Sequence, residues 1–338
     1  MKLSIIDQAP VSEGSTPADA LHNTIELAKL ADRLGYERYW IAEHHGMATL
    51  ASPAPEILIT RVAAETSHIR VGSGGVMLPH YSPMKVAETF RMLHALYPDR
   101  VDLGVGRAPG GTGLETLALM RDRKRHEVAD DFPQQMMELL AFLNRGFPSD
   151  HPFSRINLTP AMPGGPEVWL LGSSMWSASA AAQFGVPYAF AHFIDQRPTR
   201  SAIEYYRSHF APSDYLSAPR AIVALGAICA DTNEEAQRLA ASSRLLIRRI
   251  RRGDSRPVPT PEDALKELNA MPDPEPPVAT EFPRYHVGAP EELRDKLIDM
   301  ASQLGVEELM IVTIVYDHRA RMRSYELLAK AFDLKPRS

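Results

Sequence analysis

The sequence predicts a single closed α/β barrel of the (β/α)8, or TIM, type. Eight short apolar runs are each followed by a segment with the period of a helix. The runs are apolar along most of their length, as expected for parallel strands that are covered on both faces. The alternative, a doubly wound open sheet, usually has a glycine-rich turn after its first strand, and residues 8–11 contain no glycine.

The first strand and helix illustrate how the elements are assigned. Residues 2–7 form an apolar run, and Pro17 suits the first position of a helix over residues 17–34 that ends at Gly35. The same patterns predict strands at 38–42, 69–77, 100–106, 167–172, 187–191, 220–230 and 308–315, and helices at 54–67, 83–97, 176–184, 198–210, 233–252 and 319–332.

Two stretches interrupt the alternation within this one domain, which we expect to span residues 1–338. Residues 107–166 are too long for one loop and helix, and should hold a loop, one or two helices and a connector rich in proline and glycine. Residues 253–283 contain eight prolines around a weak helix near 261–270. A long insertion between strands seven and eight fits an active-site lid and an inert insertion equally well.

Composition restricts the partners and the compartment. A net charge of −5 argues against a nucleic-acid binder, so the five arginines in residues 244–252 are interpreted as a solvated helix face. The single cysteine, Cys229, excludes an intrachain disulfide and a cysteine-cluster metal site, and it fits a cytoplasmic protein. We expect no metal, no signal peptide and no membrane span, since no apolar run approaches the ~18 residues that a span needs.

Phosphate-binding chemistry is indicated at two strand ends. Ser173, Ser174 and Ser177 lie at the start of a predicted helix, where hydroxyl and backbone N–H groups bind anions. Arg107 follows another strand and precedes a glycine-rich loop at 110–113. Helix capping alone would explain one of the serines, and a surface ion pair alone would explain the arginine. A structural role and a phosphate-binding role therefore both stand as interpretations of these residues.

Two further strand ends suggest the rest of a pocket. Gly74 and Gly75 interrupt the third strand, which fits either a bend at the barrel rim or a flat ring system lying against the strand. His44 and His45 are adjacent, so in an extended segment they point in opposite directions and do not share a metal. One of them can serve as a general acid or base while the other is structural, and a structural role for both is the alternative.

The sequence resembles the bacterial luciferase-like flavin monooxygenases over nearly its whole length. Four segments at strand ends carry the resemblance: Ala-Glu-His-His at 42–45, and residues 71–83, 100–110 and 171–174. Their details are most similar to non-luminescent members, such as tailoring oxygenases of polyketide pathways. Gly106 stands where true luciferases have a reactive cysteine, which argues against light emission and not against flavin binding.

The resemblance implies non-covalent binding of FMN in a (β/α)8 barrel. It assigns the phosphate to Arg107 and to the serines at 173, 174 and 177, and it adds Ala9 to the cofactor-binding residues. It assigns the flavin ring to Gly74 and Gly75, where the family commonly has a non-prolyl cis peptide. His44 and Glu43 become the catalytic pair, with Glu43 orienting His44 or biasing its protonation.

The implied reaction uses reduced FMN supplied by a separate flavin reductase. Oxygen adds at flavin C4a, and the resulting hydroperoxide transfers one oxygen atom to a small molecule of the aldehyde or aromatic polyketide type. The alternatives are a deazaflavin-dependent hydride-transfer enzyme and a non-catalytic flavin-binding protein on the same fold. The resemblance also implies a homodimer formed by the helices after strands two and three, with Ile57, Leu58, Val86 and Phe90 as candidate contacts.

Overall fold

The computed structural model describes residues 1–338 except 109–112, 121–130, 272–279 and 338. Its strands all run parallel and form one sheet in the order β6-β5-β4-β3-β2-β1-β9-β7-β8, and the additional pairing of β6 with β7 closes it. Strands β1 to β7 and β9 therefore form the predicted eight-stranded barrel. The strands are β1 (Lys2–Asp7), β2 (Arg38–Ile41), β3 (Arg70–Met77), β4 (Val101–Gly106), β5 (Glu167–Gly172), β6 (Tyr188–Ala191), β7 (Ala221–Cys229), β8 (Tyr285–Gly288) and β9 (Glu308–Val312).

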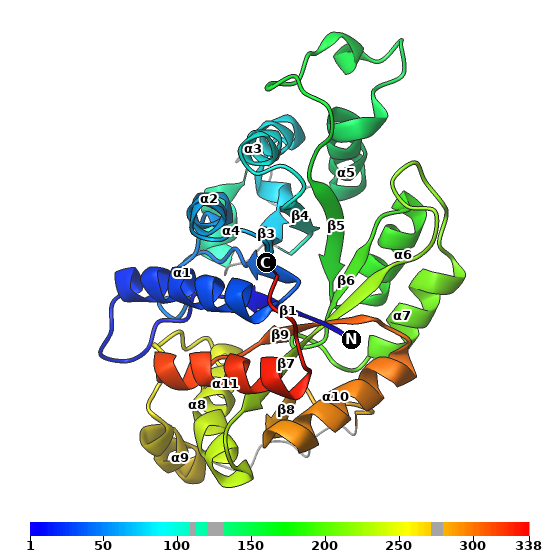
Figure 1. Ribbon diagram of the computed structural model, residues 1–338. Coiled ribbons are helices and arrows are strands. Elements are labelled where there is room, and N and C mark those ends of the chain that lie inside the picture. The colour runs from blue at the N-terminus through cyan, green and yellow to red at the C-terminus, as the bar shows by residue number, and fades with distance from the viewer. Residues whose placement is uncertain (109–112, 121–130, 272–279, 338) are drawn as a thin grey trace.

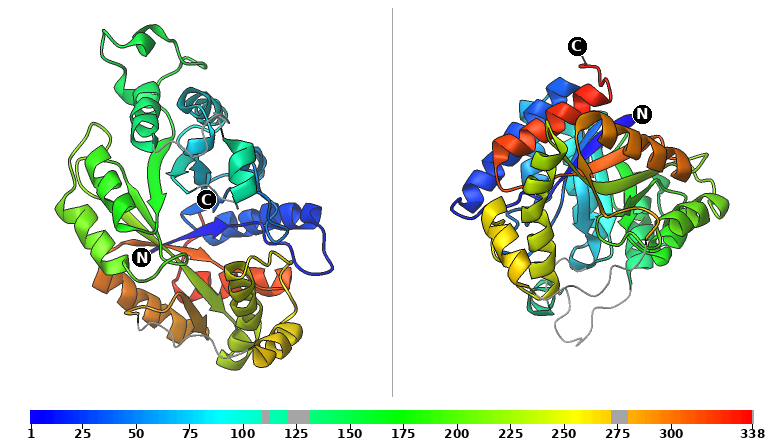
Figure 2. Two further views of the ribbon diagram at one scale, coloured as in Figure 1. Left: turned by 180° about the vertical axis from the view of Figure 1, so that it is seen from behind. Right: turned by 90° about the horizontal axis from the view of Figure 1, so that it is seen from below.

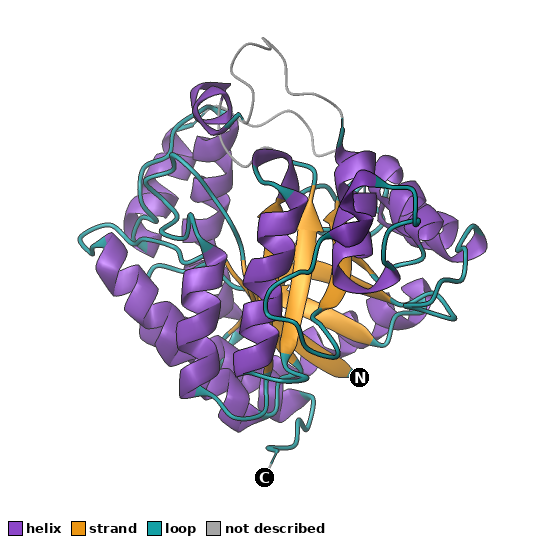
Figure 3. Cartoon of the chain, turned by 90° about the horizontal axis from the view of Figure 1, so that it is seen from above, coloured by secondary structure: helices purple, strands orange, loops and turns teal. Residues whose placement is uncertain are grey.

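Helices form a ring around the barrel (Figures 1 and 3). They are α1 (Pro17–Leu34), α2 (Pro55–Glu65), α3 (Pro83–Leu96), α4 (Gly113–Leu119), α5 (Phe132–Leu140), α6 (Met175–Phe184), α7 (Thr199–Ser208), α8 (Asn233–Arg251), α9 (Pro261–Ala270), α10 (Pro290–Leu304) and α11 (His318–Ala331). The segment between α5 and β5 extends away from the barrel in two opposite views (Figures 1 and 2). It is the connector rich in proline and glycine that the sequence predicts.

Strand β8 and helix α10 are the elements that the sequence analysis missed. Strand β8 has four residues and pairs only with the second half of β7, Gly226–Cys229, because the first half, Ala221–Ala224, pairs with β6. So short a strand leaves little sequence pattern. Helix α10 does carry a helical pattern, since Leu293, Leu297 and Leu304 are buried on one face. It was missed because the (β/α)8 pattern needs one helix after the seventh strand, and the helix predicted at 233–252 already supplies it.

The insertion at 253–283 contacts the barrel more extensively than its composition suggests. Val258 is fully buried, and its N–H donates to the Val11 carbonyl at 2.8 Å. The predicted helix is present as α9, which packs Ala264 against α8, and Phe282 is also buried. The high proline content led us to expect few apolar anchors here, and for the described part of the insertion that expectation is wrong. A lid function for it stays a prediction, and residues 272–279 lie outside the described residues.

Buried charges close the N-terminal end of the barrel, opposite the predicted site. The Arg38 guanidinium contacts the carboxylates of Asp102 at 2.8 Å, Glu167 at 3.0 Å and Glu308 at 3.0 Å. The Trp40 indole N–H also donates to Asp102 Oδ2 at 2.8 Å. This network fixes Trp40 inside the barrel, where its ring forms part of the floor of the pocket described below.

Candidate active site

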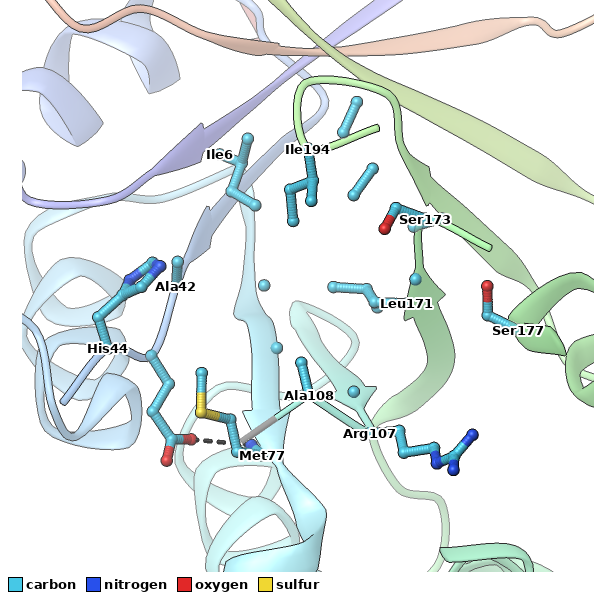
Figure 4. Close-up of a pocket in the computed structure, with 18 of the residues that line it drawn as sticks. Ile6, Ala42, His44, Met77, Arg107, Ala108, Leu171, Ser173, Ser177 and Ile194 are labelled. Carbon is cyan, nitrogen blue, oxygen red and sulfur yellow. Dashed lines mark hydrogen bonds between the residues drawn. The ribbon is translucent and has the colours of Figure 1, made fainter. Parts of the chain in front are cut away.

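A cavity of about 600 Å³ opens at the C-terminal ends of the barrel strands. Figure 4 shows its two sides, with His44 on one side and Arg107, Ser173 and Ser177 on the other. Most of the residues predicted from the strand ends therefore meet in one pocket. This arrangement follows from the parallel barrel, because the carboxyl ends of all its strands lie at the same face.

The serines divide into two roles. Ser174 caps α6: its hydroxyl accepts the Ser177 N–H at 3.4 Å, while the Ser177 hydroxyl donates to the Ser174 carbonyl at 2.7 Å and lies 2.9 Å from the Tyr188 hydroxyl. Capping and packing thus occupy both side chains. Ser173 lines the pocket, and its hydroxyl makes no hydrogen bond within the described part of the chain.

Arg107 and the start of α6 lie together on one side of the pocket, which carries the positive charge of the guanidinium. The Arg107 guanidinium lies over the Trp176 ring, 4.4 Å from its centroid, and Trp176 also contacts Phe132 edge-to-face at 5.6 Å. The first N–H groups of a helix carry partial positive charge and have no partner within the helix. Gly172 permits this arrangement, since a Cβ there would lie 2.4 Å from the Ser177 Cβ.

The end of β3 is flat because it is built from glycine. The peptide bond between Gly74 and Gly75 is cis, as the resemblance implied, and both residues line the pocket. A Cβ on Gly75 would come within 2.7 Å of the Gly104 carbonyl oxygen on β4, and one on Gly74 within 2.9 Å of Ile6. Close packing between strands therefore requires these glycines, and no side chain from either of them enters the pocket.

Glu43 orients His45, whereas the sequence analysis expected it to orient His44. The buried Glu43 Oε1 lies 2.8 Å from the His45 Nε2 and accepts the Tyr81 hydroxyl at 2.6 Å. Its Oε2 accepts the backbone N–H of Met77 at 3.0 Å (Figure 4). This carboxylate thus ties the segment after β2 to the end of β3. The expectation failed because the carboxylate contacts Met77 and Tyr81 from other parts of the chain and, within its own segment, His45 in place of the adjacent His44.

His44 enters the pocket as a neutral imidazole. Burial, with a smaller effect of His45, lowers the pKa of its ring from 6.5 to about 4. Its Nδ1 is buried and has no hydrogen-bond partner among the described residues. The backbone N–H of His44 donates to the Ser52 carbonyl at 2.9 Å, which fixes the loop that carries the ring. His44 is therefore the predicted histidine whose ring lines the cavity, and this ring makes no hydrogen bond within the described part of the chain.

Ala9 lies outside the pocket, so its predicted cofactor contact is not supported. It is fully buried with a φ of 48°, and its N–H donates to Asp7 Oδ1 at 2.7 Å. The same carboxylate oxygen accepts a hydrogen bond from Arg321 at 2.7 Å. Ala9 thus has no exposed surface to offer a ligand, and the preceding residue, Gln8, lines the cavity instead.

The analysis of strand ends also missed several apolar lining residues. Trp40, Leu171, Ala189 and Met310 lie within strands whose inward-facing positions sequence alone does not identify, because the runs are apolar on both faces. Trp176 was detectable, since it lies between two of the serines that were singled out.

The described residues contain no cluster of three or more metal-ligating side chains and no helix that is long and apolar enough to cross a membrane. The fold is a parallel (β/α)8 barrel with a cavity at the C-terminal ends of its strands. At 20% identity and a TM-score of 0.72, the chain shares this fold with the oxygenating constituent of 3,6-diketocamphane monooxygenase of Pseudomonas putida, solved with FMN.

Closer comparisons identify the family. The luciferase-like monooxygenase family model matches residues 1–308. The crystal structure of apo-MsnO8 is 51% identical, with a TM-score of 0.92 and 99% of each chain covered. A luciferase-like monooxygenase of Escherichia coli K12 is 38% identical over 98% of this chain and 96% of the relative. The N-acetyl-S-alkylcysteine monooxygenase of Bacillus subtilis 168 is 35% identical over 98% of both chains.

The chain belongs to the luciferase-like monooxygenase family, and it is a monooxygenase. The predicted resemblance and enzyme class are thereby confirmed.

Proposed function

We propose that this protein is an FMN-dependent monooxygenase that takes reduced FMN from a separate flavin reductase and, with O2, oxygenates a small organic substrate. One observation carries the proposal: a single pocket joins an anion-binding helix start to a histidine with an unpartnered ring nitrogen, across a flat glycine surface. The helix start suits a phosphate, the histidine suits proton handling at an oxygen atom, and the glycine surface between them suits a planar ring.

The pocket residues fit FMN in polarity as well as in position. Arg107, Ser173 and the first N–H groups of α6 would hold the phosphate, and the Gly74–Gly75 surface with Leu171 would contact the ring. Bound reduced flavin supplies the electrons that activate O2. The chain contributes the binding groups and a largely apolar enclosure that excludes water from the reacting atoms.

His44 supplies the proton-handling group. At neutral pH its imidazole carries one N–H donor and one acceptor nitrogen, because burial holds its pKa near 4. It therefore holds or moves a proton at an oxygen atom without placing a charge in the pocket. Glu43 and His45 act one step away, as positioning residues that fix the ends of β2 and β3.

The first experiment tests the cofactor through its phosphate. Titration of the purified protein with FMN, riboflavin and a deazaflavin should show the tightest binding for FMN. Arg107→Ala should weaken FMN by about tenfold or more and riboflavin much less, since a charge-assisted contact contributes roughly 1.5–3 kcal/mol. Arg61→Ala, at an arginine 61% exposed on α2, is the matched control. Equal losses for FMN and riboflavin would remove Arg107 from the phosphate site.

The second experiment separates the two histidines by coupling, the product formed per reduced FMN consumed. His44→Ala should leave FMN affinity nearly unchanged, lower product yield and release more hydrogen peroxide, because general acid–base help is typically worth ~10²–10⁴ in rate. His45→Ala should act mainly on the thermal midpoint, since it breaks the contact with Glu43. Full coupling in His44→Ala refutes its role.

We also propose a homodimer through α2 and α3, with a corrected set of contacts. Leu58, Val86 and Phe90 are buried at 8%, 6% and 1% exposure and pack on the barrel, so they are unavailable to a partner. Ile57 is 69% exposed, and Met92 and Leu96 on α3 are 58% and 57% exposed. These three exposed apolar side chains on neighbouring helices replace the expected four.

A further inference from the structure

The part of the pocket that is not assigned to flavin binding indicates the class of substrate. Ile6, Trp40, Ala189, Ala224 and Met310 come from five different strands and are each at most 4% exposed. They belong to one apolar cluster inside the barrel, and all of them line the cavity. We call these five residues the inner wall. Two of them are alanines, whose small side chains leave space where larger ones would fill the barrel.

The mouth of the cavity beside the inner wall is apolar as well. Ile194 lines the pocket and is 56% exposed, and Phe193 beside it packs against the inner-wall cluster. A ligand that occupies the inner wall would be covered by these side chains. Exposed large apolar groups at a cavity mouth fit an apolar ligand better than a hydrated one.

Among the residues that the structure describes, ionised groups are absent from this side of the pocket. Within the described part of the chain, the lining residues with a carboxylate or guanidinium are Glu43 and Arg107. The Glu43 oxygens already accept from the Met77 N–H and the Tyr81 hydroxyl and contact His45. Arg107 lies over Trp176 on the side proposed to bind the phosphate. A charged substrate on the inner wall would therefore be desolvated without a counter-charge, which is costly.

Two neutral polar groups remain at the edge of the inner wall. Gln8 and His44 follow β1 and β2, which are paired neighbours in the barrel through Asp7 and Ile41. Among the described residues no hydrogen bond involves the Gln8 side-chain amide or the His44 ring; the Nδ1 of His44 is buried, which leaves the Nε2 to meet a ligand in the cavity. An amide and a neutral imidazole together offer donors and acceptors without charge, the complement of a carbonyl or hydroxyl group.

We propose that the substrate is an uncharged, mostly apolar molecule that seats its hydrocarbon part on the inner wall and turns one carbonyl or hydroxyl group toward Gln8 and His44. This inference rests on the proposed function, since it assigns the remaining space to an oxygenated substrate. It names Gln8 as a substrate-positioning residue. The polar group of the substrate satisfies the two side chains that the chain itself leaves unpaired.

Three matched ligands test the charge preference by calorimetric titration of the wild-type protein with saturating oxidised FMN. They are 2-naphthaldehyde, methyl 6-formyl-2-naphthoate and the 6-formyl-2-naphthoate anion. The aldehyde and the ester should bind with similar affinity, and the anion should bind about 100-fold more weakly than the ester, because only charge separates that pair in the buried pocket. An anion that binds within about threefold of the ester overturns the inference, as does failure of both uncharged ligands to bind.

The same titrations on cofactor-free protein keep this result distinct from the proposed function. The inner wall belongs to the chain, so the order of affinities should persist without FMN. If that order holds but reduced FMN and O2 yield no oxygenated product from the uncharged ligands or from a wider panel of uncharged aldehydes and aromatics, the proposed function fails and the binding preference stands. If product forms equally well from the anion, the proposed function stands and the substrate class is wrong.

The role of Gln8 has its own test. Gln8→Leu should weaken 2-naphthaldehyde about fivefold, the size of one neutral hydrogen bond, and leave 2-methylnaphthalene unchanged. The methyl compound has the same ring system without the carbonyl group. An equal loss for both ligands means that the substitution damaged the pocket surface, and it removes Gln8 from the proposal.

Discussion

Replacing His44 by glutamine should make the protein less sensitive to acid. The folded protein lowers the pKa of His44 from 6.5 to about 4, mainly because burial disfavours the charged ring. As the pH falls through 6.5, His44 of the unfolded chain takes up a proton that the folded chain refuses until about pH 4. Acidification therefore lowers the free energy of unfolding over this interval. Above pH 6.5 His44 causes no such loss, and the loss grows as the pH falls toward 4.

The pKa difference sets the size of the effect. Between pH 7 and pH 5, proton uptake by the unfolded chain at this one site lowers the free energy of unfolding by about 2 kcal/mol. Glutamine has similar hydrogen-bonding groups and does not titrate. The free energy of unfolding of His44→Gln should thus fall by about 2 kcal/mol less than that of the wild type over the same interval, whatever its value at pH 7.

The assay is urea unfolding at pH 7, 6 and 5 for the wild type, His44→Gln and His68→Asn. His68 is exposed, and its contact with Asp32 is made by the backbone N–H, so its replacement should follow the wild-type pH dependence. If His44→Gln loses stability as steeply as the wild type between pH 7 and pH 5, His44 is not held neutral by burial. The proposed role of His44 as a neutral proton donor in the pocket would then also be wrong.

Three further outcomes test the fold, the phosphate side of the pocket and the oligomeric state. Arg38→Met removes the guanidinium that the carboxylates of Asp102, Glu167 and Glu308 share and should cost about 3–5 kcal/mol in urea unfolding at pH 7, whereas a loss under about 1 kcal/mol would mean that the network contributes little. Gly172→Ala places a Cβ 2.4 Å from that of Ser177 and should weaken FMN binding in a flavin titration with little change for riboflavin; unchanged FMN affinity would separate the start of α6 from the phosphate. Met92→Asp combined with Leu96→Asp should convert a dimer into a monomer in sedimentation at micromolar concentration, and a wild-type monomer would reject the dimer itself.

The elements that the sequence predicted well are those with a strong local pattern. The helix at 17–34 and the strand at 167–172 were placed at their observed bounds, because capping residues and apolar runs mark them locally. Strand β8 was missed because its four residues are defined by pairing with β7, a contact between segments far apart in the chain. Long-range pairing of so few residues leaves almost no local signal.

The candidate site shows the same difference between what local sequence patterns predict and what long-range contacts decide. The strand-end rule brought His44, Gly74 and Ser173 to one pocket without any coordinates, because a parallel barrel gathers its carboxyl strand ends. This rule predicts which residues lie near the pocket but not where their side chains point. It therefore included Ala9, which is fully buried and does not line the cavity, and it gave Glu43 the wrong histidine.

By itself, the sequence determined the barrel, the order of its strands and the set of strand ends where chemistry belongs, because periodicity and chain order are local properties. Only the tertiary structure decided which of those side chains act together. Glu43 meets Tyr81 across 38 residues and Asp7 meets Arg321 across 314, and such contacts exist only once the barrel has closed. Closure also removes water from His44 and leaves the inner wall uncharged, so the protonation state and the substrate preference are properties of the enclosed space.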